Sequence, residues 1–169
     1  MNAPVHLQDI HAGREAFQRD LAAYLKGRSL ADVGWVEPDD LTLLVPVFVR
    51  NPETQQPDFY LLRLVFDHYP KGPPSAQFVN PLTLSYEYPK DVMWVPRSEG
   101  SQTIAFHPNY NGNVQLICSS TTLEFYKVNH SVEPANVWNC DRMNFISTLS
   151  AIRAGLTDGF YKGRAKAPA

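Results

Sequence analysis

The sequence lacks the features that mark several classes of protein. Its 169 residues include only two cysteines, Cys118 and Cys140, too few for the disulfide framework of a small secreted protein. No apolar run approaches the ~18–20 residues that a membrane-spanning helix needs. Residues 1–9 have neither the basic start nor the apolar stretch of a secretory signal. We therefore expect a cytoplasmic protein whose thiols stay reduced and free to react.

Charge and motif content argue against further classes. The formal net charge is -2 at pH 7, so we expect no general attraction to nucleic acid or to an anionic membrane. No GxxxxGK[ST], GxGxxG or GxSxG pattern occurs, which gives no support to nucleotide hydrolysis or serine-hydrolase chemistry. The ligand-type residues His107, Cys118, His130 and Cys140 lack the local spacing of a zinc site. We expect neither a metal nor a cofactor.

An amphipathic helix is predicted near the start of the chain, over residues 14–26. Apolar residues recur there with helical spacing, at Phe17, Leu21, Tyr24 and Leu25. Gly13 and Gly27 bracket the pattern, and Gly27 is the expected helix stop.

A second helix is predicted near the other end, where apolar residues recur at a spacing of three: Met143, Ile146, Leu149 and Ile152. Asn139 or Asp141 is expected to cap its start, and Gly155 to end it.

The sequence between these helices indicates strands. Two runs rich in branched residues, 41–49 and 60–66, flank a polar turn at 51–57 and are expected to form an antiparallel pair. Pro46 lacks a backbone donor, so its strand is expected to lie at an edge or to carry a bulge. Shorter strands are expected at 76–79 and 103–106. Residues 82–100 are interpreted as an ordered insertion, with aromatic anchors at Tyr86, Tyr88 and Trp94.

Cys118 is the preferred candidate nucleophile, although a cysteine after an apolar run is commonly an inert core residue. It ends the apolar stretch 114–117 and precedes four hydroxyl residues, 119–122, which suggests that the chain reaches the surface there. His107 could act as its base in a Cys–His pair. Asn109 could donate to an oxyanion without titrating. Cys140, near a helix start, is the rival nucleophile.

The order of these features resembles that of the ubiquitin-conjugating enzyme superfamily. The motif YPxxPP stands at residues 69–74, His-Pro-Asn at 107–109, and Ile117-Cys118 follows, with Trp138 and a helix beyond. The resemblance covers about residues 12–156. It implies an α+β, UBC-like fold: an antiparallel β-meander of about four strands flanked by an N-terminal helix and a C-terminal helix, within a single domain over residues 1–169.

The resemblance also implies a function. Cys118 would accept a ubiquitin-like protein as a thioester from an adenylating activating enzyme and pass it to an amine on an acceptor protein. Asn109 would order the active-site loop and support the oxyanion, while His107 would hold the shape of that loop. Tyr69, Pro73 and Pro74 would brace it.

Three departures indicate a divergent member, which we interpret as one of the bacterial ubiquitin-like conjugation systems linked to phage defence. Residues 82–100 are inserted, the spacing from Asn109 to Cys118 is longer than the common one, and Trp138 lies farther beyond the cysteine. Two alternatives stay open. One is a catalytically inactive UBC-like module that binds a ubiquitin-like protein or another partner non-covalently. The other is an unrelated cysteine enzyme that pairs Cys118 with His107 or His130.

Overall fold

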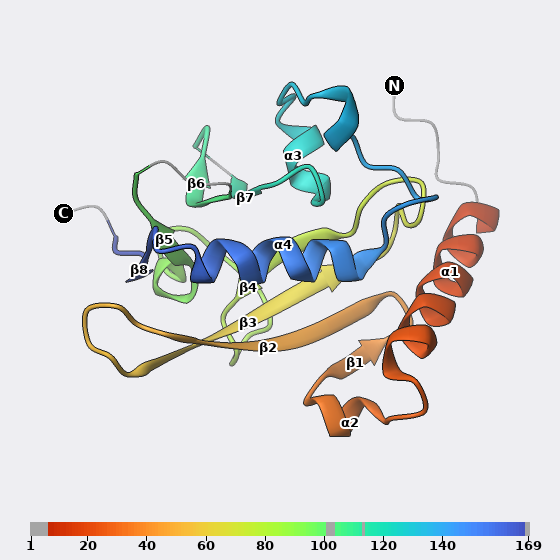
Figure 1. Ribbon diagram of the computed structural model, residues 1–169, viewed down its shortest axis with the longest axis horizontal. Helices are drawn as coiled ribbons and strands as arrows, with labels where there is room; N and C mark the ends of the chain where they lie inside the picture. The colour runs from red at the N-terminus through yellow and green to blue at the C-terminus, as the bar shows by residue number, and fades with distance from the viewer. Residues whose placement is uncertain (1–6, 101–103, 113, 168–169) are drawn as a thin grey trace.

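The chain folds as an α+β structure with a four-stranded antiparallel sheet (Figure 1). The computed structural model describes residues 7–100, 104–112 and 114–167, with side chains from residue 12 onward. The sheet is a meander in the order β1 (Val36–Asp39), β2 (Thr42–Arg50), β3 (Pro57–Val65) and β4 (Ser75–Val79). These findings confirm the predicted α+β class and the antiparallel sheet flanked by helices.

The paired strands β2 and β3 confirm the predicted antiparallel pair. Their register runs without a break from Thr42 opposite Val65 to Arg50 opposite Pro57. Pro46 lies in β2, which has neighbours on both sides, yet β1 pairs only with residues 42 and 44. The predicted edge position was therefore wrong: β2 is an inner strand of the sheet, although no residue of β1 pairs with Pro46.

Helix α1 (Leu7–Leu25) begins earlier than predicted. Gly13 therefore lies inside the helix. The helix passes very close to the segment after β3 at this point, and a Cβ at Gly13 would stand 2.7 Å from the carbonyl oxygen of Tyr69. Phe17 then stacks on Phe66, with ring centroids 3.8 Å apart. The helix ends two residues before Gly27, as expected from the sequence.

Helix α4 (Phe145–Thr157) lies across the sheet and buries Phe145, Leu149, Ile152 and Leu156 (Figure 1). The predicted caps and end of this helix were wrong. Asn144 caps it instead, since its side chain accepts from the backbone N–H of Ile146. Gly155 lies within the last turn, where a Cβ would stand 3.1 Å from side-chain atoms of Ile104 and Phe106.

The other elements lie beyond the sheet. A single-turn helix η1 (Val92–Trp94) and strand β5 (Pro96–Ser98) occupy the expected insertion, and β5 pairs with β8 (Tyr161–Arg164) near the end of the chain. Strands β6 (Ala105–Tyr110) and β7 (Val114–Cys118) form a hairpin, followed by α3 (Leu123–Lys127) and η2 (Pro134–Asn136). The two short helices α2 (Leu30–Val33) and α3 are single turns. The predicted strand at 103–106 corresponds to the start of β6, and residue 103 lies outside the described residues.

Within the described ranges, no helix has the length and apolar character that crossing a bilayer requires.

Candidate functional site

The β6–β7 hairpin carries all three predicted site residues. Cys118 ends β7 opposite Ala105, and His107 lies opposite Leu116. The register then shifts, so that Pro108 and Asn109 together oppose the single residue Gln115, and pairing resumes between Tyr110 and Val114. This extra residue is a β-bulge, which returns Tyr110 to the face of the hairpin that also bears His107 and Cys118.

Two buried polar side chains hold the hairpin against the free edge of β4. The side-chain amide of Gln115 accepts from the Phe78 N–H at 2.7 Å and donates to the Phe78 carbonyl at 2.8 Å. The Glu124 carboxylate of α3 accepts from the Ala76 N–H at 3.0 Å and from the Ser75 hydroxyl. These side chains take the place of a fifth strand, because they form hydrogen bonds with backbone groups on the free edge of β4. The bonds also fix the position of the hairpin that carries the cysteine.

Cys118 lies at a sharp turn where the chain leaves β7. The Ser119 N–H donates to the carbonyl of Ile117 at 2.8 Å, and the Thr122 hydroxyl donates to the same carbonyl at 2.9 Å. The thiol is half-buried, so the expected approach of the chain to the surface is found here. Burial raises the pKa of the Cys118 thiol above its ordinary value, because the thiolate would lose hydration.

The imidazole of His130 contacts this thiol. Its Nε2 lies 3.9 Å from the Cys118 sulfur. The ring stacks on Phe125 with centroids 5.0 Å apart and contacts the ring of Tyr110 at 5.4 Å. The positive φ of Asn129, 57°, reverses the chain after α3 and brings His130 back over the helix. The sequence suggested His130 as one of two bases for the alternative cysteine enzyme.

His107 lies on β6 in the same cluster. Its ring is 5.3 Å from that of Tyr110, and the residue is half-buried. Burial, and then the charge of the nearby His130, lower the pKa of His107 below its ordinary value. This lowered pKa favours the uncharged form of His107 at neutral pH.

Asn109 lies at the opposite end of the hairpin from Cys118. Cys118 pairs with residue 105, and the four steps from there to residue 109 correspond to about 13 Å at about 3.3 Å per residue. The side-chain oxygen of Asn109 is buried and accepts no hydrogen bond from the described residues. The structure thus brings His107 and His130 toward the cysteine cluster, whereas the oxyanion role of Asn109 stays a prediction.

The YPxxPP segment connects β3 to β4 and packs beneath the helices. The Tyr69 hydroxyl donates to the Asp20 carboxylate of α1 and accepts from the backbone N–H of Phe145 at 3.4 Å. The carbonyl of Pro70 accepts from the indole N–H of Trp138 at 2.8 Å. The carbonyl of Pro74 accepts from the Leu123 N–H at 3.1 Å. This segment therefore ties α1, α3 and α4 to the sheet edge that supports the hairpin.

The rival nucleophile Cys140 is exposed in the turn before α4. It lines a shallow depression of about 380 Å³ with Arg19 and Arg142. The helix itself starts only at Phe145, so Cys140 does not occupy its first turn. Among the described side chains, no group of three or more histidine, cysteine, aspartate or glutamate residues is placed to hold a metal ion.

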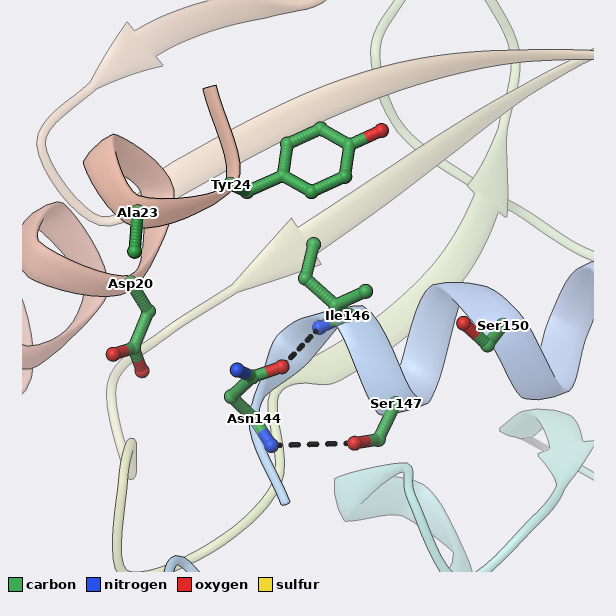
Figure 2. Close-up of a pocket in the computed structure, with 7 residues that line it drawn as sticks. All are labelled: Asp20, Ala23, Tyr24, Asn144, Ile146, Ser147 and Ser150. Atoms are coloured by element: carbon green, nitrogen blue, oxygen red, sulfur yellow. Dashed lines mark hydrogen bonds between the residues drawn. The ribbon is translucent and has the colours of Figure 1, made fainter. Parts of the chain in front are cut away.

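A larger groove of about 480 Å³ lies between α1 and α4 (Figure 2). Asp20 and Tyr24 face it from α1, and Asn144 and Ser147 face it from α4. The oxygen atoms of Asn144 and Ser147 already accept the capping hydrogen bonds of α4, at 2.9 and 3.3 Å. None of the hairpin residues lines this groove, so it is separate from the cysteine site.

Comparison of the chain with protein-family models, with curated proteins and with solved structures finds no match.

Proposed function

We propose that the chain is a divergent UBC-like conjugating enzyme that carries a ubiquitin-like protein as a thioester on Cys118. The observation that carries this proposal is the position of a half-buried thiol at the end of a hairpin that is fixed to the edge of a four-stranded meander. The same hairpin bears His-Pro-Asn on its other strand, and YPxxPP lies in the connection between β3 and β4. A helix then crosses the sheet, in the order that the family resemblance implies.

The reaction exchanges one thioester for another. The sulfur of Cys118 attacks the carbonyl carbon of the thioester on the activating enzyme, and the sulfur of that enzyme leaves as its bond to the carbon breaks. The thiol proton passes through a base to the departing sulfur, so the exchange needs no oxidant or reductant. In a second step an amine of the acceptor protein attacks the new thioester and releases Cys118 as a thiol.

The experiment that tests this function is formation of a covalent adduct. The chain is incubated with a ubiquitin-like protein, its adenylating activating enzyme and ATP, and the products are separated with and without reducing agent. We expect a reducible adduct with the native chain and with Cys140→Ala, and none with Cys118→Ala. Adducts with both variants, or stable binding without a bond at any cysteine, would contradict the proposal; the second result would identify the non-covalent module instead.

A hydrolase is the second candidate, because the 3.9 Å contact between Cys118 and His130 is the pairing that cysteine hydrolases use. Such an enzyme would release a fluorescent amine from peptide substrates without ATP or a partner protein. We prefer the thioester carrier because the meander, the YPxxPP connection and the His-Pro-Asn hairpin follow one another in the order that the family resemblance implies. Turnover of peptides that Cys118→Ala abolishes would reverse this preference.

A further inference from the structure

The imidazole of His130 contacts the proposed nucleophile, and its role is not part of the family resemblance. We propose that His130 is the base that takes the proton from the Cys118 thiol when the sulfur attacks an acyl donor. This inference rests on the proposed thioester function and assigns the proton acceptor for it.

The geometry places the two reacting atoms together. The His130 Nε2 lies 3.9 Å from the Cys118 sulfur, within the range of a long contact that shortens when substrate binds. Nε2 accepts the proton in the tautomer that carries its hydrogen on Nδ1. The thiol itself is held in place by the turn at Ile117 and Ser119.

The ring of His130 is restrained by aromatic contacts. It stacks on Phe125 at an interplanar angle of 24°, and Tyr110 contacts it at 5.4 Å. The backbone N–H of His130 donates to the carbonyl of Phe125 at 3.4 Å, which restrains the backbone beside the ring. A base held in this way needs little reorganisation when the thiol attacks the acyl carbon.

The surroundings of His130 favour transfer of the thiol proton to its imidazole while Cys118 attacks. They do not favour a thiolate–imidazolium ion pair that exists before the attack. Burial keeps the Cys118 thiol protonated at neutral pH, so a base is needed as the new bond forms. His107 and Tyr110 face His130 from β6, and the lowered pKa of His107 favours its uncharged form at neutral pH. On α3, Glu124 is turned toward β4 and Lys127 is exposed.

The step balances in protons and electrons. The S–H bond of Cys118 breaks and its proton goes to His130 Nε2, while the sulfur electron pair forms a bond to the acyl carbon. The bond from that carbon to the donor sulfur breaks, and the departing thiolate takes the proton back from the His130 imidazolium. His130 returns to its neutral form and the acyl group remains on Cys118.

The test uses a small donor that requires no protein partner, the thioester of N-acetylglycine with 2-mercaptoethanesulfonate. Transfer to Cys118 is followed by mass spectrometry in Cys140→Ala chains, which carry a single thiol. At pH 7 we expect His130→Gln to slow the transfer roughly 10²-fold, the lower end of what a general base contributes. The ratio should fall toward one as the pH rises past the thiol pKa. The matched control is His68→Gln, which changes an exposed histidine outside the cluster.

The outcomes separate a chemical role from a structural one. A slowing that is the same at every pH, or no slowing, would overturn the assignment of His130. Should His130→Gln unfold, the chain with native His130 still decides the matter: its rate must depend on pH in a way that ionisation of the thiol alone does not explain, and a rate that follows only the thiol titration overturns the proposal. A third outcome separates the two proposals. If His130→Gln slows acyl transfer from the small thioester in a pH-dependent way, but the chain forms no adduct with a ubiquitin-like protein, the proposed function is contradicted and the role of His130 is supported.

Discussion

The strongest structural prediction concerns Gln115, which joins the cysteine-bearing hairpin to the sheet. The residue is 2% exposed, and its amide satisfies both the N–H and the carbonyl of Phe78 on the free edge of β4. Replacing Gln115 by alanine removes both partners at once. Phe78 is fully buried, so water cannot easily replace them.

The expected cost follows from the two orphaned groups. Each buried donor or acceptor left without a partner costs about 1–3 kcal/mol, so Gln115→Ala should lower the free energy of unfolding by about 2–6 kcal/mol. That is a large share of the 5–15 kcal/mol (roughly) that stabilises a typical domain.

The assay is urea unfolding, combined with hydrogen exchange at the Phe78 amide. The matched control is Gln77→Ala, which changes the residue that precedes Phe78 on β4. Gln77 is half-buried and its side chain accepts one hydrogen bond, from Arg63 at 3.0 Å, so we expect a loss of about 1 kcal/mol or less. Equal losses for the two variants, with an unchanged exchange rate at Phe78, would refute the anchoring role of Gln115.

Three further predictions concern packing, pH and thiol reactivity. Gly13→Ala should destabilise the chain by about 1–3 kcal/mol despite the better helix propensity of alanine, because its Cβ would stand 2.7 Å from the Tyr69 carbonyl oxygen; a stabilised variant in urea unfolding would contradict the close approach. The lowered pKa of His107 means that the unfolded chain binds its proton more readily, so stability should be lost as the pH falls below 6.5 toward the pKa of the folded state, and His107→Gln should flatten this dependence in unfolding curves measured across that range. Iodoacetamide at pH 7.5 should label exposed Cys140 before Cys118, whose pKa is raised, as read by peptide mass spectrometry; the reverse order would contradict the described burial of Cys118.

Local sequence patterns predicted the two long helices, because the spacing of their apolar residues is itself typical of a helix. The spacing of Phe17 and Leu21 marks one helix, that of Leu149 and Ile152 marks the other, and both faces are buried as expected. The helix ends were harder to predict because they depend on tertiary contacts. Gly13 and Gly155 looked like boundaries, yet both lie inside helices at points where a neighbouring segment passes close to the helix.

The cysteine cluster depends on contacts between distant parts of the chain. The residues after Cys118 show no regular period, so the sequence could not place His130. Its position follows from α3, from the reversal at Asn129, and from the Tyr126 hydroxyl, which donates to the carbonyl of Ser120 and accepts from the backbone N–H of Trp138. The bulge that separates Asn109 from Cys118 likewise follows from the hairpin register, which motif spacing alone does not reveal.

The central claim is that Cys118 carries an acyl group as a thioester, and the most direct measurement of it is the chemical stability of the adduct with a ubiquitin-like protein. Incubated with that protein, its activating enzyme and ATP, the native chain should form an adduct that reducing agent releases. Cys118→Ser should form an oxygen ester that survives reducing agent and maps to residue 118 by mass spectrometry. An adduct of Cys118→Ser that reducing agent still releases, or one that maps to Cys140, would contradict the account.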